Sequence, residues 1–316
     1  MGTTFQRVAV VGAGAVGSFF GAMLARAGHS VVLIGRPAHA EAIGRSGLRL
    51  AMAGRTETIA LDASSEIAAA RGADLVLFSV KSTDTEAVAR ELAGVLDPGA
   101  LVVSLQNGVE NTAVIARHVA ATVVPAVVYV ATSMPEPGLV CHHGRGDLVI
   151  GAATRTFDAA TRERLDALVA CFASAAVPVR ISADVMAELW SKLMVNCAYN
   201  AISGLAQASY GELVALAPIR ELQHAVVAEV VALAAAEGVE LPLAPAIDAM
   251  ERIAPAMPAQ LSSTAQDMVR GKPSEIDHLN GFVARRGREL GVPTPANQAL
   301  HALVKLVEAR QRKGSA

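Results

Sequence analysis

The stretch Val10-Val11-Gly12-Ala13-Gly14-Ala15-Val16-Gly17 decides how the first part of this chain folds. It follows a β-forming run, Arg7–Val11, and it opens an apolar helical segment, Ala15–Ala27. A G-x-G-x-x-G pattern at such a junction predicts a strand, a tight turn and a helix. Gly12 permits the turn, Gly14 lets the backbone approach a pyrophosphate, and Gly17 lets the helix pack closely on the strand. The pattern therefore predicts a dinucleotide site at a helix N-terminus, the alternative being a glycine-rich turn without a ligand.

Outward from this motif, continuous apolar runs of strand length alternate with helical segments. The expected strands are Arg7–Val11, Val31–Ile34, Leu75–Val80, Leu101–Leu105 and Thr122–Ala131, with a hairpin at Leu48–Leu61 and short strands at Leu139–Cys141 and Leu148–Ile150. Apolar strands separated by helices indicate a parallel sheet that is buried on both faces. We expect a Rossmann-type doubly wound α/β domain over residues 1–182.

The pattern changes near Ile181, beyond which almost no strand signal remains. The expected helices are Ala183–Gln207, Glu212–Glu237 (continuing in more than one helix), Ser274–Leu290 and Asn297–Arg312. We expect an all-helical domain over residues 183–316, which gives the fold class α/β followed by all-α.

Composition excludes several classes of function. The 316 residues carry 27 Lys and Arg against 29 Asp and Glu, a net charge of −2, and aromatic residues make up 3%. Such a chain has neither the basic surface nor the stacking residues of a nucleic-acid-binding protein. The uncharged run Val8–Leu24 resembles a signal peptide or a membrane span, but the glycine spacing explains it as strand, turn and helix. We expect a cytoplasmic protein that has no membrane contact.

The cysteines and other potential ligands point away from a disulfide framework and from a metal site. Cys141, Cys171 and Cys197 are an odd number and form no C-x-x-C motif, so we expect three small buried residues. No set of His, Asp and Glu residues clusters in the sequence, and we expect no metal. The apolar helical domain is compatible with a homodimer, but the sequence does not fix the oligomeric state.

The end of the second expected strand bears on the choice between NAD and NADP. NAD sites usually place Asp or Glu there, whereas this strand ends Leu33-Ile34-Gly35-Arg36. The Arg36 guanidinium is a planar fork suited to a 2′-phosphate, which favours NADPH; the alternative is a solvated loop cation. Lys81 and Asn107 follow two further strands and are candidates to contact cofactor or substrate, or else to cap helices.

A polar stripe marks the first helix of the second domain. Lys192, Asn196 and Asn200 are spaced i, i+4, i+8 among apolar residues, so they share one face. Buried polar groups need partners, and a substrate cleft is one reason for such a stripe; a solvent-facing stripe is the other. Downstream, Ser263 and Glu275 lie in the runs Ser262-Ser263-Thr264 and Ser274-Glu275-Ile276-Asp277, which serve equally well as helix caps or as substrate ligands.

Six motifs, taken together in this order, resemble the ketopantoate reductase (2-dehydropantoate 2-reductase) family. They are G-A-G-A-V-G, V-K-S, Q-N-G-V, L-W-x-K-L-x-x-N-x-x-x-N, S-S-x-x-x-D and S-E-I-D-x-L-N-G. The resemblance covers nearly the whole chain. It implies NADPH-dependent reduction of 2-dehydropantoate, a 2-oxo acid, in the pathway to pantothenate.

The resemblance also implies roles for individual residues. Lys192 matches the family's catalytic lysine, which acts as general acid, and Glu275 matches a glutamate near substrate and cofactor. Asn196, Asn200 and Ser263 match substrate-binding positions. The implied NADPH-binding positions are Gly12, Ala13, Gly14, Ala15, Val16, Gly17, Arg36, Lys81, Asn107 and Ala131.

One position departs from the family pattern. A substrate-contacting Asn precedes Gly-Glu-Leu in the family's well-characterised reductases, whereas this chain has Tyr210 there. A phenol cannot copy the two-way hydrogen bonding of an amide. Three hypotheses follow: a ketopantoate reductase, a paralogue that reduces another 2-oxo acid or an imine as opine-type dehydrogenases do, or a non-catalytic NADPH-binding sensor.

Overall fold

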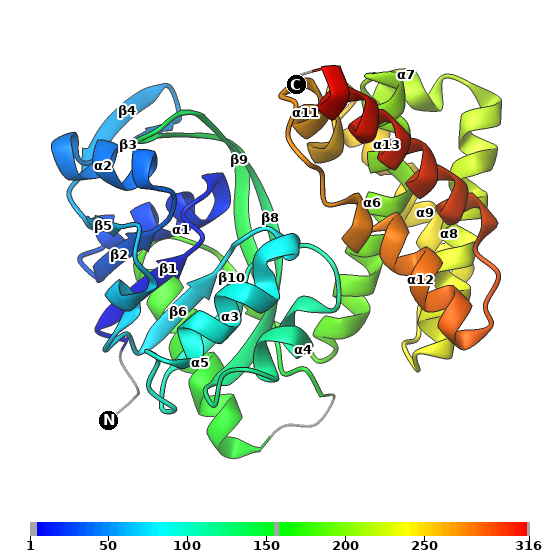
Figure 1. Ribbon diagram of the computed structural model, residues 1–316. Coiled ribbons are helices and arrows are strands. Elements are labelled where there is room, and N and C mark those ends of the chain that lie inside the picture. The colour runs from blue at the N-terminus through cyan, green and yellow to red at the C-terminus, as the bar shows by residue number, and fades with distance from the viewer. Residues whose placement is uncertain (1–4, 155–157, 315–316) are drawn as a thin grey trace. The chain divides into compact units, whose positions relative to one another are not determined.

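The computed structural model describes residues 5–154 and 158–314. Contacts divide the chain into two compact units, residues 1–186 and 187–316. Figure 1 shows a sheet with flanking helices in the first unit and helices in the second.

The first unit is built on one mixed sheet. Its strands are β1 (Arg7–Val11), β2 (Ser30–Ile34), β3 (Leu48–Met52), β4 (Arg55–Ile59), β5 (Asp62–Ser64), β6 (Leu75–Phe78), β7 (Leu101–Ser104), β8 (Thr122–Glu136), β9 (Leu139–Ile150) and β10 (Val179–Ile181). The order is β4-β3-β9-β8-β7-β6-β1-β2-β5, with β10 paired to β9. Strands β5, β2, β1, β6, β7 and β8 run parallel, whereas β9 is antiparallel to β8. The carboxyl ends of the parallel strands therefore share one edge.

Helices cover both faces of this sheet. They are α1 (Ala15–Arg26), α2 (Pro37–Ser46), α3 (Thr85–Ala93), α4 (Asn111–Ala116) and α5 (Ala159–Ser174), with short 3₁₀ turns η1 (Ile67–Ala70) and η2 (Ser82–Asp84). Val8 and Val10 pack in one core with α1 and α5, while Ala9 and Val11 pack in another with α3 and α4. Successive strand residues face opposite sides, so a fully apolar strand needs cover on both. The expected doubly wound α/β fold is confirmed.

One local expectation was wrong. The segment from Leu139 to Ile150 is the single strand β9, not two short strands joined by polar turns. It forms a long hairpin with β8, interrupted by register shifts. Polar residues such as His143 and Arg145 are tolerated in the strand because their side chains are exposed there.

The second unit contains only helices among its described residues. They are α6 (Val185–Ala206, beginning just before the unit boundary), α7 (Tyr210–Val214), α8 (Ala217–Ala236), α9 (Leu243–Glu251), α10 (Ile253–Ala256), α11 (Ser263–Val269), α12 (Asn280–Leu290) and α13 (Pro295–Gly314), with the 3₁₀ turn η3 (Ile276–His278). The all-helical expectation is confirmed.

The expected helix Ser274–Leu290 begins later than the sequence indicated. Its regular part is α12, which starts at Asn280, and η3 precedes it. Ser274 and Asp277 instead bond to side chains of α13, so the segment that carries Glu275 is not α-helical.

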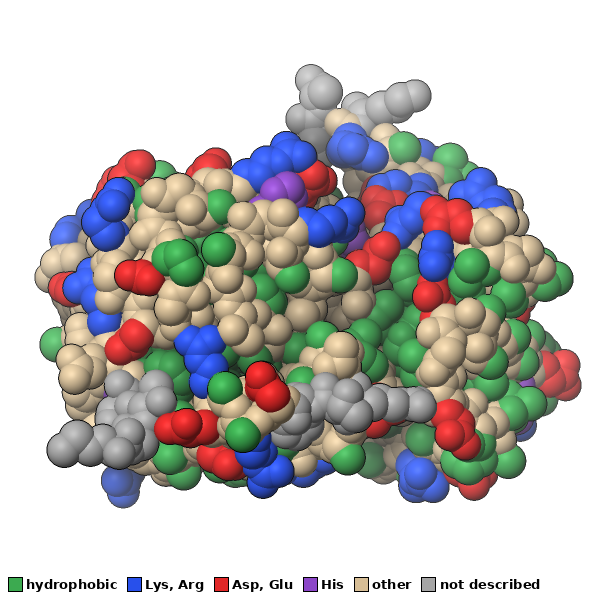
Figure 2. Space-filling model, turned by 90° about the horizontal axis from the view of Figure 1, so that it is seen from below, with side chains coloured by type: hydrophobic (Ala, Val, Ile, Leu, Met, Phe, Trp, Pro, Cys, Tyr) green, Lys and Arg blue, Asp and Glu red, His purple; other side chains and the backbone are tan. Residues whose placement is uncertain are grey.

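No helix in the described residues is long and apolar enough to cross a membrane. On the face drawn in Figure 2, basic and acidic side chains are interspersed, as the near-zero net charge leads one to expect.

Candidate active site

The glycine-rich turn joins β1 to α1 as expected. Gly12 has a φ of +96°, which a side chain would strain, and its N–H donates to Ile34 O at 2.9 Å. A Cβ at Gly12 would overlap the backbone nitrogen of Val80 and lie 2.6 Å from the Ser79 carbonyl carbon. A Cβ at Gly17 would overlap Ser79 Oγ. Both glycines are therefore required by close packing of the loop on the end of β6.

Gly14 differs from its two neighbours. A Cβ there would meet only Gly12 O, at 4.0 Å, and the backbone at Gly14 is extended, so packing does not demand a glycine. Gly14 is exposed and caps α1 without a side-chain hydrogen bond, and the first turn of α1 contains no acidic residue. An open, uncapped helix N-terminus fits a pyrophosphate, whose oxygens accept from backbone N–H groups.

Arg36 lies at the carboxyl end of β2, next to the glycine loop. It is exposed, and no hydrogen bond or ion pair of its guanidinium is found within residues 5–154 and 158–314. Gly35 brings this turn against the loop, because a Cβ there would lie 2.9 Å from Ala13 Cβ. The arrangement leaves a planar cation beside the loop and available to an anion.

Lys81 and Asn107 belong to neighbouring turns at the same edge of the sheet, after β6 and β7. A buried network connects the two turns: Asn111 Nδ2 donates to Ser82 Oγ at 3.1 Å and to Asn107 O at 2.7 Å. Gln106 Nε2 donates to Val80 O at 3.0 Å. The sequence named Lys81 and Asn107 but missed Asn111, whose supporting role depends on packing between two loops.

Ala131 lies apart from this group along β8. Pro125 is the last β8 residue paired with β7, and Ala131 stands opposite Gly144 in the β8–β9 hairpin. Its proposed contact with cofactor rests on the family resemblance alone.

In the second unit, α6 carries the polar stripe. Lys192 and Asn196 are half-buried, and Asn200 is 3% exposed, so the stripe runs from the margin of the unit into its interior. The rest of the helix supplies core residues, among them Leu193, Met194, Cys197 and Tyr199.

The inner end of the stripe meets the start of α11. Asn200 Nδ2 lies 3.5 Å from Ser263 Oγ, and Ser262 Oγ donates to Asn200 O at 3.2 Å. Ser262 also accepts from Ala265 N and is therefore the helix cap, whereas Ser263 is exposed. The structure thus separates the two serines: Ser262 supports the helix and Ser263 presents its hydroxyl beside Asn200.

Glu275 lies, half-buried, in the segment between α11 and α12. Just after it, the fully buried Asn280 donates from Nδ2 to Cys197 O at 3.1 Å and to Asn297 Oδ1 at 3.0 Å. This amide, which sequence reasoning missed, fastens the start of α12 to α6 and to α13.

Tyr210 begins α7, where Ser209 and Glu212 form a capping box. Its ring centroid lies 4.6 Å from that of Tyr199, and its N–H donates to Gln260 O at 2.9 Å. Burial raises the pKa of the Tyr210 phenol to about 12, so the hydroxyl stays protonated at neutral pH.

The cysteines and potential metal ligands that the structure describes form no further site. Cys171 and Cys197 are buried as expected, but Cys141 is only half-buried because it lies in the β8–β9 hairpin. Burial raises the pKa of the Cys171 thiol to about 11, which keeps it protonated and unreactive. Within the described residues, no three His, Cys, Asp or Glu side chains form a group that could hold a metal ion.

Comparison with known proteins identifies the family of both units. Residues 8–155 match the family described as "Ketopantoate reductase PanE/ApbA", and residues 184–308 match "Ketopantoate reductase PanE/ApbA C terminal". A 2-dehydropantoate 2-reductase of Halobacterium salinarum is 33% identical over 306 residues, which cover 96% of this chain and 99% of that protein.

The chain belongs to the ketopantoate reductase family. It is therefore a member of an oxidoreductase family, as the sequence motifs indicated.

Two solved structures are similar to this chain over nearly its whole length. A PanE/ApbA family ketopantoate reductase from Ralstonia eutropha JMP134 is 51% identical with a TM-score of 0.89, covering 97% of this chain and 99% of that one. D-mandelate dehydrogenase, solved with NADH and anilino(oxo)acetate, has the same TM-score of 0.89 at 24% identity, with 97% and 99% covered. At this identity the likeness to D-mandelate dehydrogenase is one of fold alone.

Proposed function

We propose that the protein reduces 2-dehydropantoate to pantoate with NADPH. The observation that carries the proposal is the polar set on the helical unit: Lys192, Asn196 and Asn200 on one face of α6, with Ser263 beside Asn200. It occurs in a chain whose other unit has an open glycine loop. A sensor that only bound NADPH would not need this set.

The glycine loop fits the pyrophosphate of the cofactor, as the open position at Gly14 and the uncapped start of α1 indicate. Arg36 would pair with the 2′-phosphate that distinguishes NADPH from NADH, while Lys81 and Asn107 would contact the cofactor farther along the same edge. When bound, NADPH supplies the hydride that reduces the substrate carbonyl.

The protein's own chemistry is to place a proton and a positive charge at the carbonyl oxygen. In the proposed mechanism, the Lys192 ammonium stabilises the negative charge that develops there and then donates its proton to that oxygen. Asn196, Asn200 and Ser263 supply amide and hydroxyl groups that orient the substrate carboxylate and hydroxyl. Glu275 accepts a hydrogen bond from the substrate hydroxyl or from the lysine.

Tyr210 supports a second candidate, reduction of another 2-oxo acid or of an imine. Its phenol stays protonated at neutral pH and donates and accepts through one oxygen, whereas the amide of the family's usual Asn has two N–H donors and a separate acceptor oxygen. A substrate whose side chain packs against the ring or accepts one hydrogen bond would suit this position better than pantoate's hydroxyl-bearing chain.

A substrate panel with deuterated cofactor tests both candidates. NADPH carrying deuterium at the transferable C4 position is incubated with ketopantoate, with other 2-oxo acids and with imines, and products are analysed by mass spectrometry. Deuterium at C2 of pantoate, formed faster than any other labelled product, supports the first candidate. Preferential labelling of another 2-hydroxy acid or of an amine supports the second, and no labelled product at all contradicts both.

A further inference from the structure

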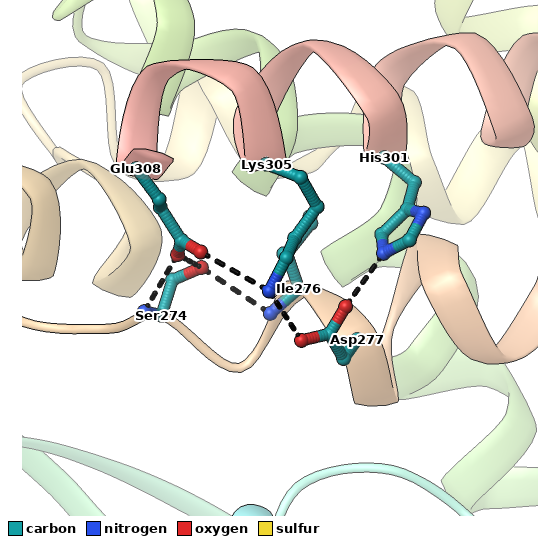
Figure 3. A network of polar contacts seen from close by, with 6 residues as sticks. All are labelled: Ser274, Ile276, Asp277, His301, Lys305 and Glu308. Carbon is teal, nitrogen blue, oxygen red and sulfur yellow. Dashed lines mark hydrogen bonds and ion pairs between the residues drawn. The ribbon is translucent and has the colours of Figure 1, made fainter. Parts of the chain in front are cut away.

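The segment that carries Glu275 is fastened to α13 immediately before that residue (Figure 3). The N–H and the hydroxyl of Ser274 both donate to Glu308 Oε1, at 2.9 and 2.6 Å. Ile276 N in turn donates to Ser274 Oγ at 3.3 Å. The backbone on both sides of Glu275 is therefore fixed by one buried serine.

A second attachment lies two residues after Glu275, at Asp277. Asp277 Oδ1 accepts from His301 Nε2 and Asp277 Oδ2 accepts from Lys305 Nζ, each at 2.6 Å. His301 and Lys305 are four residues apart and so lie on one face of α13. Partial burial raises the pKa of the Asp277 carboxyl, but the hydrogen bonds from both partners outweigh it and leave the pKa below its usual value. The carboxylate is therefore charged at neutral pH.

Lys305 links the two attachments. Its Nζ also lies 3.3 Å from Glu308 Oε2, and Glu308 is only 6% exposed. A buried carboxylate is stable only when it is paired and hydrogen-bonded. Lys305 thus pairs with both carboxylates: Glu308, which accepts from Ser274, and Asp277, which follows Glu275 in the chain.

Gly281 leaves room for this arrangement. A Cβ at that position would lie 2.8 Å from His301 Nε2 and 3.0 Å from Ile276 O. The imidazole can reach Asp277 because Gly281 presents no side chain at this point of α12.

We propose that Asp277, together with His301, Lys305 and Glu308 of α13, positions Glu275 for the substrate. The inference rests on the proposed function, since it requires Glu275 to act on a bound oxo acid. Glu275 lies in a segment without α-helical hydrogen bonding, and functional groups need supports that restrict their position to a fraction of an ångström. The four side chains supply that support from a helix, and they are positioning residues.

The test is a double-mutant cycle between Asp277→Asn and Glu275→Gln. Asp277→Asn removes the charge that binds His301 and Lys305 while keeping the shape of the side chain. In the otherwise native protein, we expect kcat/KM for the oxo acid to fall about 10- to 100-fold, the cost of a small misplacement. The NADPH dissociation constant should stay within about twofold, because the glycine loop is untouched.

In the Glu275→Gln background, the same Asp277→Asn change should cost less than about twofold, because a residue that acts through Glu275 has nothing left to position. Glu251→Gln is the matched control. It breaks another His–carboxylate pair of the helical unit, that of His224 and Glu251 at 2.8 Å, and should leave kcat/KM unchanged. His301→Leu, at a partly exposed side chain, repeats the test if Asp277→Asn does not fold, and should lower kcat/KM in the same direction.

If Asp277→Asn lowers kcat/KM by the same factor in the native protein and in the Glu275→Gln protein, the positioning role is overturned while the proposed function stands. The same holds for His301→Leu where it replaces Asp277→Asn. A native chain that reduces no oxo acid or imine would overturn the proposed function, and the inference with it.

Discussion

The hydroxyl of Ser79 donates a hydrogen bond of 2.8 Å to the carbonyl oxygen of Gly12. This contact joins the end of β6 to the turn after β1 and holds the glycine loop in one conformation. Ser79 and Val80, which follow β6, leave no room for a side chain at Gly12, and Ser79 leaves none at Gly17, but the space beside Gly14 is open. The three glycines of the motif are therefore explained differently: Gly12 and Gly17 by close packing, and Gly14 by the open space that a ligand could occupy.

The first prediction separates these reasons. Gly12→Ala places a Cβ against the Val80 backbone at a φ of +96° and should lower the free energy of unfolding by about 2–3 kcal/mol. Gly14→Ala has room in the free protein, so its unfolding free energy should change by less than about 0.5 kcal/mol. Its NADPH affinity should nevertheless fall by about tenfold or more, since the methyl group occupies the place of a pyrophosphate oxygen.

Urea unfolding and cofactor titration of both variants check this. A Gly14→Ala protein that binds NADPH as tightly as the native chain would show that no pyrophosphate approaches this turn.

The second prediction concerns the choice of cofactor. Arg36→Ala removes the exposed guanidinium at the end of β2, so the ratio of kcat/KM for NADPH to that for NADH should fall by about 10- to 100-fold, the value of one charge-assisted bidentate contact. Arg45→Ala is the matched control, because it removes another exposed cation from the adjoining helix α2. If both substitutions changed this ratio equally, Arg36 would act only through the general surface charge and not through a contact with the 2′-phosphate.

The third prediction concerns the proton donor. Lys192→Ala should lower kcat by about 10²–10⁴-fold, the usual contribution of a positioned acid, without weakening NADPH binding more than about twofold. Arg252→Ala removes an exposed cation elsewhere in the helical unit and should change neither quantity. Steady-state kinetics and direct cofactor titration give both numbers; near-native turnover of Lys192→Ala would assign the proton to another group.

The fourth prediction concerns stability at low pH. His39 is buried, accepts at Nδ1 from Gly138 N at 2.9 Å, and has Nε2 3.1 Å from Ser18 Oγ. The ring is therefore neutral in the folded chain, with its proton on Nε2, and burial lowers the pKa of His39. The unfolded chain takes up a second ring proton at this histidine below about pH 6.5, whereas the folded chain does so only at lower pH.

The contribution of His39 to the free energy of unfolding should therefore be fully present above about pH 6.5 and should be lost as the pH is lowered below that value. His39→Gln should reduce the loss of unfolding free energy between about pH 7.5 and 5.5, whereas His143→Gln, at an exposed histidine, should not. Urea unfolding at the two pH values measures the difference, and an unchanged pH dependence in His39→Gln would mean that other groups cause it.

The fifth prediction concerns the substrate. If Tyr210 sets specificity, Tyr210→Asn should raise kcat/KM for ketopantoate relative to other oxo acids by about tenfold or more, since a site that hydrogen-bonds its substrate discriminates strongly. The loss of the ring next to Tyr199 should lower Tm, so only folded protein is compared. An unchanged order of preference across the panel would remove Tyr210 from the specificity argument.

Sequence reasoning worked where local pattern determines structure. The apolar strands, the G-x-G-x-x-G turn and the i, i+4, i+8 stripe of α6 are short-range signals, and the doubly wound and helical units follow from them. It failed for β9, because the polarity of His143 and Arg145 resembles a turn until β8 supplies an antiparallel partner. It also misjudged the start of α12, where Ser274 and Asp277 bond to residues far along the chain.

The supporting residues were harder still to predict. The importance of Asn111 and Asn280 appears only in the folded chain, where Asn111 bonds to Ser82 and Asn280 bonds to the Cys197 carbonyl, each far away in the sequence. The family resemblance named residues expected to contact ligand, but the side chains that hold those residues in place required the structure.

The most direct test of the account is the steady-state oxidation of NADPH, and separately of NADH, by the purified chain with ketopantoate. We expect rapid turnover with NADPH and much slower turnover with NADH, because Arg36 would bind the 2′-phosphate and Lys192 would donate its proton to the carbonyl oxygen. Absence of turnover with ketopantoate, in protein that still binds NADPH, would contradict the proposed substrate.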